Sequence, residues 1–181
     1  MLVLAKVLGE VVDAMRQQRN LHLGLARVVL VAAGQPAPDF TLRTGEGNAF
    51  TREDLVGQTT VLVFYPFAFS EVCTSQLSIY NDLLEDFRAR GAVLYGVSCD
   101  ATYSQTAFQR ELGIEIEQLS DFEPKGEVCR AFGVLHQGGF PERALVMTGP
   151  DGVVLWSHVA DTPADLPGAN LIFDALDAAA V

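Results

Sequence analysis

The sequence predicts an α/β protein in which helices flank both faces of a central mixed β-sheet. Two apolar runs rich in β-branched and aromatic residues, TTVLVFYP and GAVLYGVSCD, are typical of strands buried on both faces. Helical segments alternate with these runs, and a hairpin precedes the last helix. With 181 residues, the chain is long enough to bury a core within one domain.

The first elements follow Gly34. The segment GQPAPDFTL leads into a short strand, and TREDLVGQ is typical of a brief helix. Thr51 is a candidate N-cap for that helix, with Asp54 three residues later. The strand TTVLVFYP comes next, and we expect one helix over residues 70–90 after it.

The second half begins with the strand GAVLYGVSCD and a helix over residues 102–112, which Gly113 ends. A short segment at QLSD and a helix around GEVCRAFGV follow. The pattern RALVMTGPDGVVLWSHV predicts a hairpin that turns at GPDG. A last helix is expected from about residue 166 to 179.

Composition narrows the class of protein. The net charge of −11 argues against nucleic acid or an anionic membrane as a partner. The three cysteines, Cys73, Cys99 and Cys129, are too few and too scattered for a disulfide scaffold, and they lack the paired spacing of a zinc site. We therefore expect no metal, and a reducing, cytoplasmic location.

Residues 1–33 differ from the domain predicted for residues 34–181. Apolar residues at helical spacing predict an amphipathic helix near the start, although a poorly ordered extension is the alternative. The segment is too interrupted by charge for a transmembrane helix. Its likeness to a signal peptide is weak, because Arg27 breaks the apolar run.

Cys73 is the first candidate for chemistry. It lies at the start of a helix that follows a central strand, and active sites of such sheets form at the carboxyl ends of strands. Free N–H groups and the helix dipole favour the thiolate there, which is the reactive form. Glu71 opposes a second negative charge, so a cation is needed. The alternative is that Cys73 is a small buried apolar residue.

Two upstream residues strengthen this interpretation. Ser70 suits an N-cap, and its hydroxyl also suits a substrate oxygen. Pro66 suits the end of a strand, and it would also stiffen the loop and shield the sulfur. Each alone is unspecific, but together they form Pro-x-x-x-Ser-x-x-Cys at a strand-to-helix junction.

This pattern resembles the signature of the peroxiredoxins, Pro-x-x-x-(Thr/Ser)-x-x-Cys. The resemblance extends from Gly34 to about Ala178 and includes GQPAPDFTL, VLVFYPFAFSEVC and ERALVMTGPDG. The segments FYPFAFSEVCTSQL and LSDFEPKGEVCRAFGV are most similar to the one-cysteine alkyl hydroperoxide reductase E type. The resemblance implies a thioredoxin-like fold and thiol-dependent reduction of hydroperoxides without a cofactor.

By residue, the resemblance makes Cys73 the peroxidatic cysteine and Arg143 the activating arginine, while Pro66 and Ser70 complete the substrate pocket. The chemistry needs such a set, because a thiolate attacks one oxygen while donors stabilise the negative charge that grows on the other. Arg143 also offsets the charge of Glu71. The products are a sulfenic acid on Cys73 and water or an alcohol.

Neighbouring residues complete the predicted site. We assign Val72, Phe67 and Gln76 to the pocket and to its orientation. Gln76 stands where many relatives carry glutamate, but its amide oxygen still accepts a hydrogen bond. The aromatic residues Tyr65, Phe67 and Phe69 gather around the loop, and an exposed patch of this kind favours a homodimer. Shielding of the sulfur within one chain is the alternative.

The sequence also bears on how the enzyme is recycled. Ser78 occupies the position five residues after Cys73, where one related group carries its resolving cysteine. Packing is the simplest role for Cys99 and Cys129, although Cys129 remains the one candidate for an internal disulfide with Cys73. We therefore expect an outside thiol to act. The resemblance suggests a low-molecular-weight thiol such as mycothiol, with a mycoredoxin or thioredoxin.

Two other functions stay open at this stage. A thiol–disulfide oxidoreductase usually carries Cys-x-x-Cys, and Gln76 occupies the fourth position here. A peroxide sensor would keep the same reactive cysteine and pass the oxidation to a partner. His136 lies in a loop that leads to Arg143, but without a second ligand it is a poor metal candidate.

Overall fold

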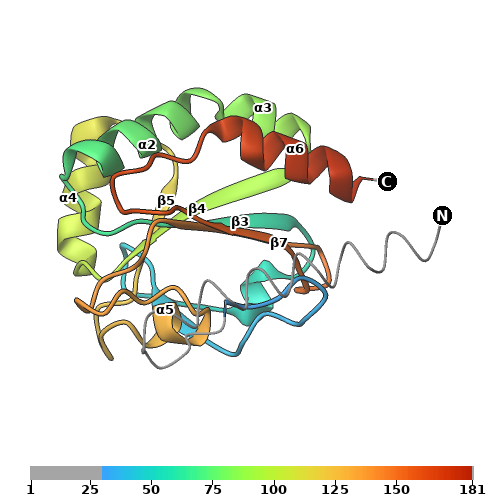
Figure 1. Cartoon of the computed structure of the whole chain (residues 1–181). Helices are drawn as coiled ribbons and strands as arrows, with labels where there is room; N and C mark the ends of the chain where they lie inside the picture. Colours follow the sequence, from blue (N-terminus) through green and yellow to red (C-terminus); the bar gives the residue numbers. More distant parts are fainter. Residues whose placement is uncertain (1–29, 181) are drawn as a thin grey trace.

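The computed structural model describes residues 30–180. Seven strands form one mixed sheet in the order β2-β1-β5-β4-β3-β6-β7, with helices on both faces (Figure 1). The predicted α/β class, a central mixed sheet flanked by helices, is confirmed.

The strands are β1 (Thr41–Arg43), β2 (Ala49–Thr51), β3 (Thr59–Phe64), β4 (Ala92–Ser98), β5 (Glu117–Ser120), β6 (Ala144–Thr148) and β7 (Val154–Val159). The helices are η1 (Arg52–Leu55), α2 (Glu71–Asp82), α3 (Leu84–Ala89), α4 (Thr102–Leu112), α5 (Glu127–Ala131) and α6 (Ala169–Ala179). Strand β3 lies centrally, parallel to β4 and antiparallel to β6. It is buried over five of its six residues, as its apolar run predicts.

The side chains of the sheet divide into two cores because successive residues of a strand point to opposite faces. Val61 and Val63 of β3 pack under α2, α3, α4 and α6, whereas Leu62 and Phe64 pack against α5 and the β1–β2 hairpin. Figure 1 shows α2, α3 and α6 on one face and α5 on the other. We call these the α2 face and the α5 face.

Several local predictions are confirmed. Helix α4 spans residues 102–112, and Gly113 ends it in the left-handed conformation. The Asp54 carboxylate accepts hydrogen bonds from the backbone N–H and the hydroxyl of Thr51, so the expected capping pair forms, on a 3-10 helix.

The single helix expected over residues 70–90 is wrong. Two helices form, because Leu83 leaves helical geometry at ψ 9° and its N–H donates to Tyr80 instead of continuing the α-helical ladder. The turn allows Leu84 and Phe87 of α3 to reach the core under α6. The last helix begins at Ala169 rather than near residue 166, after Pro167 and the N-cap Gly168. Strand β2 was not predicted, since only Phe50 of its three residues is buried.

Most of the predicted N-terminal extension, residues 1–29, lies outside the described residues. Leu30 and Val31 pack against the α5-face core, and the N–H of Val31 donates to the carbonyl of Phe132 at 3.2 Å. Within residues 30–180, no helix is both long and apolar enough to cross a bilayer.

Candidate active site

The site begins at the junction between β3 and α2. Strand β3 ends at Phe64, a loop follows, and Ser70 is the N-cap of α2. Cys73 is therefore the third residue of the helix, in the first turn, where backbone N–H groups have no carbonyl of their own helix to bind. Its side chain is fully buried on the α2 face.

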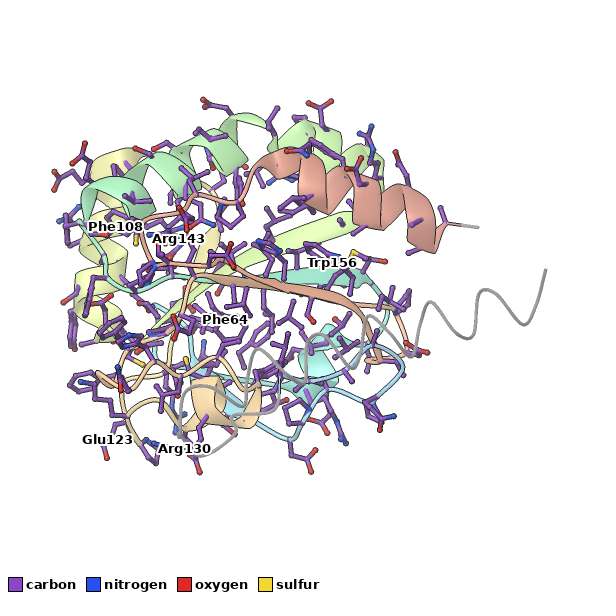
Figure 2. All side chains as sticks on the ribbon, viewed as in Figure 1. Phe64, Phe108, Glu123, Arg130, Arg143 and Trp156 are labelled. Atoms are coloured by element: carbon purple, nitrogen blue, oxygen red, sulfur yellow. The ribbon has the colours of Figure 1, made fainter. Side chains whose placement is uncertain are left out.

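Arg143 approaches the same sulfur from β6. It directly precedes this strand and shares the face of Leu145 and Met147, so alternation along the strand directs it toward α2. Figure 2 shows Arg143 on the α2 side of the sheet. Its Nη2 donates to Cys73 Sγ at 3.3 Å, and the side chain is 2% exposed. Residues 70 positions apart in the chain thus make a direct contact.

The other two partners of the guanidinium are neutral oxygens. Nε donates to the carbonyl of Pro163 at 2.8 Å, and Nη1 donates to the amide oxygen of Gln76. Three fixed acceptors determine the orientation of the planar fork. Because both oxygens are uncharged, the positive charge of Arg143 remains free to stabilise a thiolate on Cys73.

Gln76 is held in place by Tyr80. Its Nε2 donates to the hydroxyl of Tyr80 at 3.3 Å, and that hydroxyl donates to the carbonyl of Pro167 at 2.6 Å. This direction of donation leaves the amide oxygen of Gln76 facing Arg143. Burial raises the pKa of Tyr80 to about 12, so the hydroxyl keeps its proton at neutral pH.

A hydrogen bond joins the loop over the Cys73 sulfur to the segment that follows β4. Pro66 is buried, and the N–H of Ala68 donates to the carboxylate of Asp100 at 2.8 Å. Phe69 has φ 66°, a conformation that costs a side-chain-bearing residue about 1 kcal/mol or more. Its ring packs on Phe108 with centroids 5.1 Å apart, and this contact helps to hold the loop in shape.

Ser70 and Val72 lie where the sequence predicts, at the beginning of α2. Ser70 is the N-cap by position, yet its hydroxyl donates to the carbonyl of Phe67 at 3.1 Å rather than capping the helix with its side chain. Its oxygen retains acceptor capacity. Val72 is half-buried beside Cys73.

The predicted aromatic cluster needs a correction. Phe67 and Phe69 are 47% and 51% exposed, but Tyr65 is fully buried, because it shares the inward-facing parity of Val61 and Val63. Its hydroxyl donates to Gln118 at 2.8 Å, so Tyr65 belongs to the core and not to an exposed patch.

His136 is connected to the active-site loop through Phe140. Its ring stacks on Phe140 at 4.3 Å, and Phe140 packs on Phe67 with centroids 4.7 Å apart. His136 Nδ1 accepts the N–H of Gly138, so this nitrogen is occupied within the loop. The histidine therefore stiffens the loop that leads to Arg143.

The structure does not bring Cys129 to Cys73. Cys129 is buried in the α5-face core, with the sheet between it and Cys73. Its neighbours are Cys99 and Asp121, and one ligand atom from each of the three residues lies within 4.8 Å of the others. Sequence spacing gave no sign of this group, because 30 positions separate the two cysteines.

Tyr80, Pro163 and Asp100 were missed by sequence reasoning. Tyr80 had a signal, because it lies four residues after Gln76 and seven after Cys73, on one face of the helix. Pro163 and Asp100 had none. Pro163 acts through its carbonyl, which every residue carries, and Asp100 reaches the loop only through the fold.

Comparison with known proteins gives a consistent result. The sequence model of the AhpC/TSA family matches residues 33–157, more than half of the chain. Peroxiredoxin 2 of Thermoplasma acidophilum is 32% identical over 128 residues, which cover 68% of this chain and 64% of that protein. Alkyl hydroperoxide reductase E of Mycobacterium tuberculosis is 29% identical over 151 residues, covering 82% of this chain and 98% of that protein.

A solved structure agrees. The crystal structure of Enterococcus faecalis AhpC matches with a TM-score of 0.75 and 26% identity, covering 83% of this chain and 93% of that chain. The predicted thioredoxin-like fold is therefore confirmed. This chain belongs to the AhpC/TSA family, and like the peroxiredoxins it matches, it is a thiol-dependent peroxidase.

Proposed function

We propose that the protein reduces hydrogen peroxide and organic hydroperoxides with Cys73 as the peroxidatic cysteine, in a one-cysteine cycle. The observation that carries the proposal is the contact between Arg143 Nη2 and Cys73 Sγ at 3.3 Å, at the start of a helix. A buried arginine with neutral oxygens as its other partners favours the thiolate, which is the nucleophile.

In the first step the Cys73 thiolate attacks one oxygen of the hydroperoxide and the O–O bond breaks. The sulfur becomes sulfenic acid, and the leaving oxygen takes up a proton to give water or an alcohol. Arg143 and the N–H groups of the first turn of α2 act as donors where negative charge grows. The Ser70 hydroxyl donates its own proton to the carbonyl of Phe67, so its oxygen serves as an acceptor for the hydrogen of the hydroperoxide. Pro66, Phe67 and Val72 shape the pocket around them.

An outside thiol then completes the cycle. It attacks the sulfenic sulfur, water leaves, and a mixed disulfide forms; a second thiol releases Cys73. The separation of Cys73 and Cys129 by the sheet supports this route over an internal disulfide. Similarity to the alkyl hydroperoxide reductase E type favours mycothiol, with a mycoredoxin or thioredoxin, and a reducing cytoplasm supplies such thiols.

We further propose that the protein is a homodimer. Two large apolar side chains of the active-site loop are exposed, Phe67 at 47% and Phe69 at 51%, and such patches often mark interfaces. Light scattering at micromolar concentration is expected to give twice the chain mass. A monomer mass would overturn the dimer and leave the peroxidase proposal intact.

The proposed cycle is tested by mass. Reduced protein receives one equivalent of hydroperoxide and a sulfenic-acid reagent, and the label is mapped by peptide. The label is expected on Cys73, and added thiol is expected to restore steady turnover. A quantitative disulfide between Cys73 and Cys129 would overturn the one-cysteine cycle. Oxidation without thiol-dependent turnover would favour the peroxide sensor.

A further inference from the structure

Two thiols outside the active site meet on the α5 face. Cys99 directly follows β4, and Cys129 lies in α5. Both belong to the core opposite Cys73, and the two sulfurs lie within 4.8 Å of each other and of a carboxylate oxygen of Asp121. Neither thiol has a part in the cycle proposed above.

The backbone around these thiols is tied together. Asp121 donates its N–H to the carbonyl of Ser98 at 2.8 Å, and its carboxylate accepts the N–H groups of Val128 at 3.1 Å and Cys129 at 2.8 Å. One residue therefore joins the end of β4, through its backbone, to the start of α5, through its side chain. The two cysteines are held as neighbours by these bonds and not by chance packing.

The turn before α5 adds to this placement. Gly126, the N-cap, has φ 69°, and a Cβ built there would lie 3.7 Å from Cys99 Sγ and 2.6 Å from Leu135 Cδ1. The missing side chain lets the helix start pack directly over the Cys99 sulfur. The absence of a side chain at Gly126 thus allows Cys129 to lie close to Cys99.

A metal is the less favourable occupant. Both oxygens of Asp121 already accept backbone N–H groups, so coordination would compete with the bonds that begin α5. The thiols interact with each other instead. A hydrogen bond with Cys129 lowers the pKa of Cys99. The same hydrogen bond raises the pKa of Cys129, and burial adds to that increase. Cys99 is thereby the more acidic thiol and Cys129 the one that keeps its proton, an asymmetry that suits disulfide formation.

We propose that Cys99 and Cys129 form a second dithiol–disulfide couple, a redox modification site on the face opposite the peroxidatic cysteine. A hydroperoxide oxidises the Cys99 thiolate to sulfenic acid and leaves as water or an alcohol after taking up a proton. The Cys129 thiol attacks that sulfur, and its proton departs with the hydroxyl as water. In total, two thiols and one hydroperoxide give one disulfide, one alcohol or water, and one further water.

Burial does not exclude this reaction. Cys99 is 8% exposed, whereas Cys73 is fully buried. Disulfide formation requires the two sulfurs, which lie within 4.8 Å of each other, to approach to a bonding distance of about 2 Å.

The test uses the full chain carrying Cys73→Ser, which removes the peroxidatic thiol and makes the result independent of the proposed cycle. Hydrogen peroxide is added to the reduced, chelator-treated protein. We expect a loss of about 2 Da and of both titratable thiols, reversed by dithiothreitol. Tryptic mapping is expected to give residues 91–110 linked to residues 126–130.

Two matched controls carry Cys99→Ser or Cys129→Ser in addition, and neither is expected to lose the 2 Da. Two free thiols after peroxide treatment would overturn the proposal, as would separate oxygen additions to each cysteine. So would a stoichiometric metal that protects both thiols. If a serine variant does not fold, the same mapping on the parent protein decides, because residues 126–130 then link either to residues 91–110 or to the Cys73 peptide, residues 53–88.

Discussion

The two faces of the sheet place the same residue type in opposite electrostatic settings. On the α2 face, Cys73 meets the guanidinium of Arg143 at 3.3 Å. On the α5 face, Cys99 and Cys129 meet each other and the carboxylate of Asp121. A cation stabilises a thiolate, whereas the carboxylate of Asp121 opposes one, so the lowered pKa of Cys99 depends on its hydrogen bond with Cys129. Exposure does not separate the faces, because all three cysteines are buried. The charge of the partner separates them.

The comparison also shows how each face is supported. Arg143 is fixed by side chains and carbonyls from α2 and from the segment that leads to α6. Asp121 is fixed by the backbone at the start of α5. The first arrangement leaves a positive charge directed at a sulfur. The second uses its negative charge to begin a helix.

The largest effect on the rate of peroxide reduction is expected from replacing a cysteine with serine. Cys73→Ser should lower peroxide reduction by on the order of 10³-fold or more, since the nucleophile is lost. Cys99→Ser and Cys129→Ser should keep the initial oxidation rate within about twofold, because the sheet separates both from the site. Stopped-flow oxidation measures all three. Parent-level peroxide consumption by Cys73→Ser would remove Cys73 from the mechanism.

The next effect concerns the cation. Arg143→Ala should slow oxidation by about 10²–10³-fold, because it removes both the charge beside the sulfur and a donor to the breaking bond. Arg143→Lys should recover only part of the rate, since an ammonium lacks the fork that binds sulfur and two oxygens together. The matched control is Arg130→Ala, an exposed arginine of α5. Figure 2 shows Arg130 on the side of the sheet opposite Arg143. Equal rates in Arg143→Ala and the control would make Arg143 a structural residue only.

A smaller effect is expected at the residue that positions Arg143. Gln76→Ala should slow oxidation about tenfold, because Arg143 loses one hydrogen bond. Gln76→Glu keeps an acceptor but adds a carboxylate that offsets the charge of Arg143, so it should restore only part of the rate. Gln105→Ala is the control, because Gln105 is equally buried and its amide binds Ser98 and Leu119 instead. If both alanine variants slow oxidation alike, the loss reflects burial and not orientation.

The smallest effect concerns pH and the support behind Gln76. The pKa of Tyr80 is raised to about 12 from an unfolded value near 10. Its contribution to stability is therefore present below pH 10 and is lost as the pH rises through 12, at about 1.4 kcal/mol per pH unit. Denaturant unfolding between pH 8 and 12 should show a shallower decline in Tyr80→Phe. At neutral pH this variant should lose about 1–3 kcal/mol, because the carbonyl of Pro167 loses its donor. An unchanged pH slope would contradict the assignment.

Much of this protein was determined by the sequence alone. Apolar runs predicted β3 and β4, Gly113 predicted the end of α4, and the Pro66–Ser70–Cys73 pattern predicted the strand-to-helix junction. These features are local: burial pattern, left-handed glycine and helix capping depend on residues within one or two turns. The fold class followed from their order along the chain.

Tertiary structure decided the rest. The break at Leu83, the burial of Tyr65 and the hydrogen bond from Arg143 to the carbonyl of Pro163 depend on what packs against each segment. Above all, the tertiary structure makes Cys99, and not Cys73, the neighbour of Cys129. Sequence distance has no bearing on that choice. Cys99 continues the parity of Val97 in β4 and faces α5, whereas Cys73 lies in α2 on the other side of the sheet.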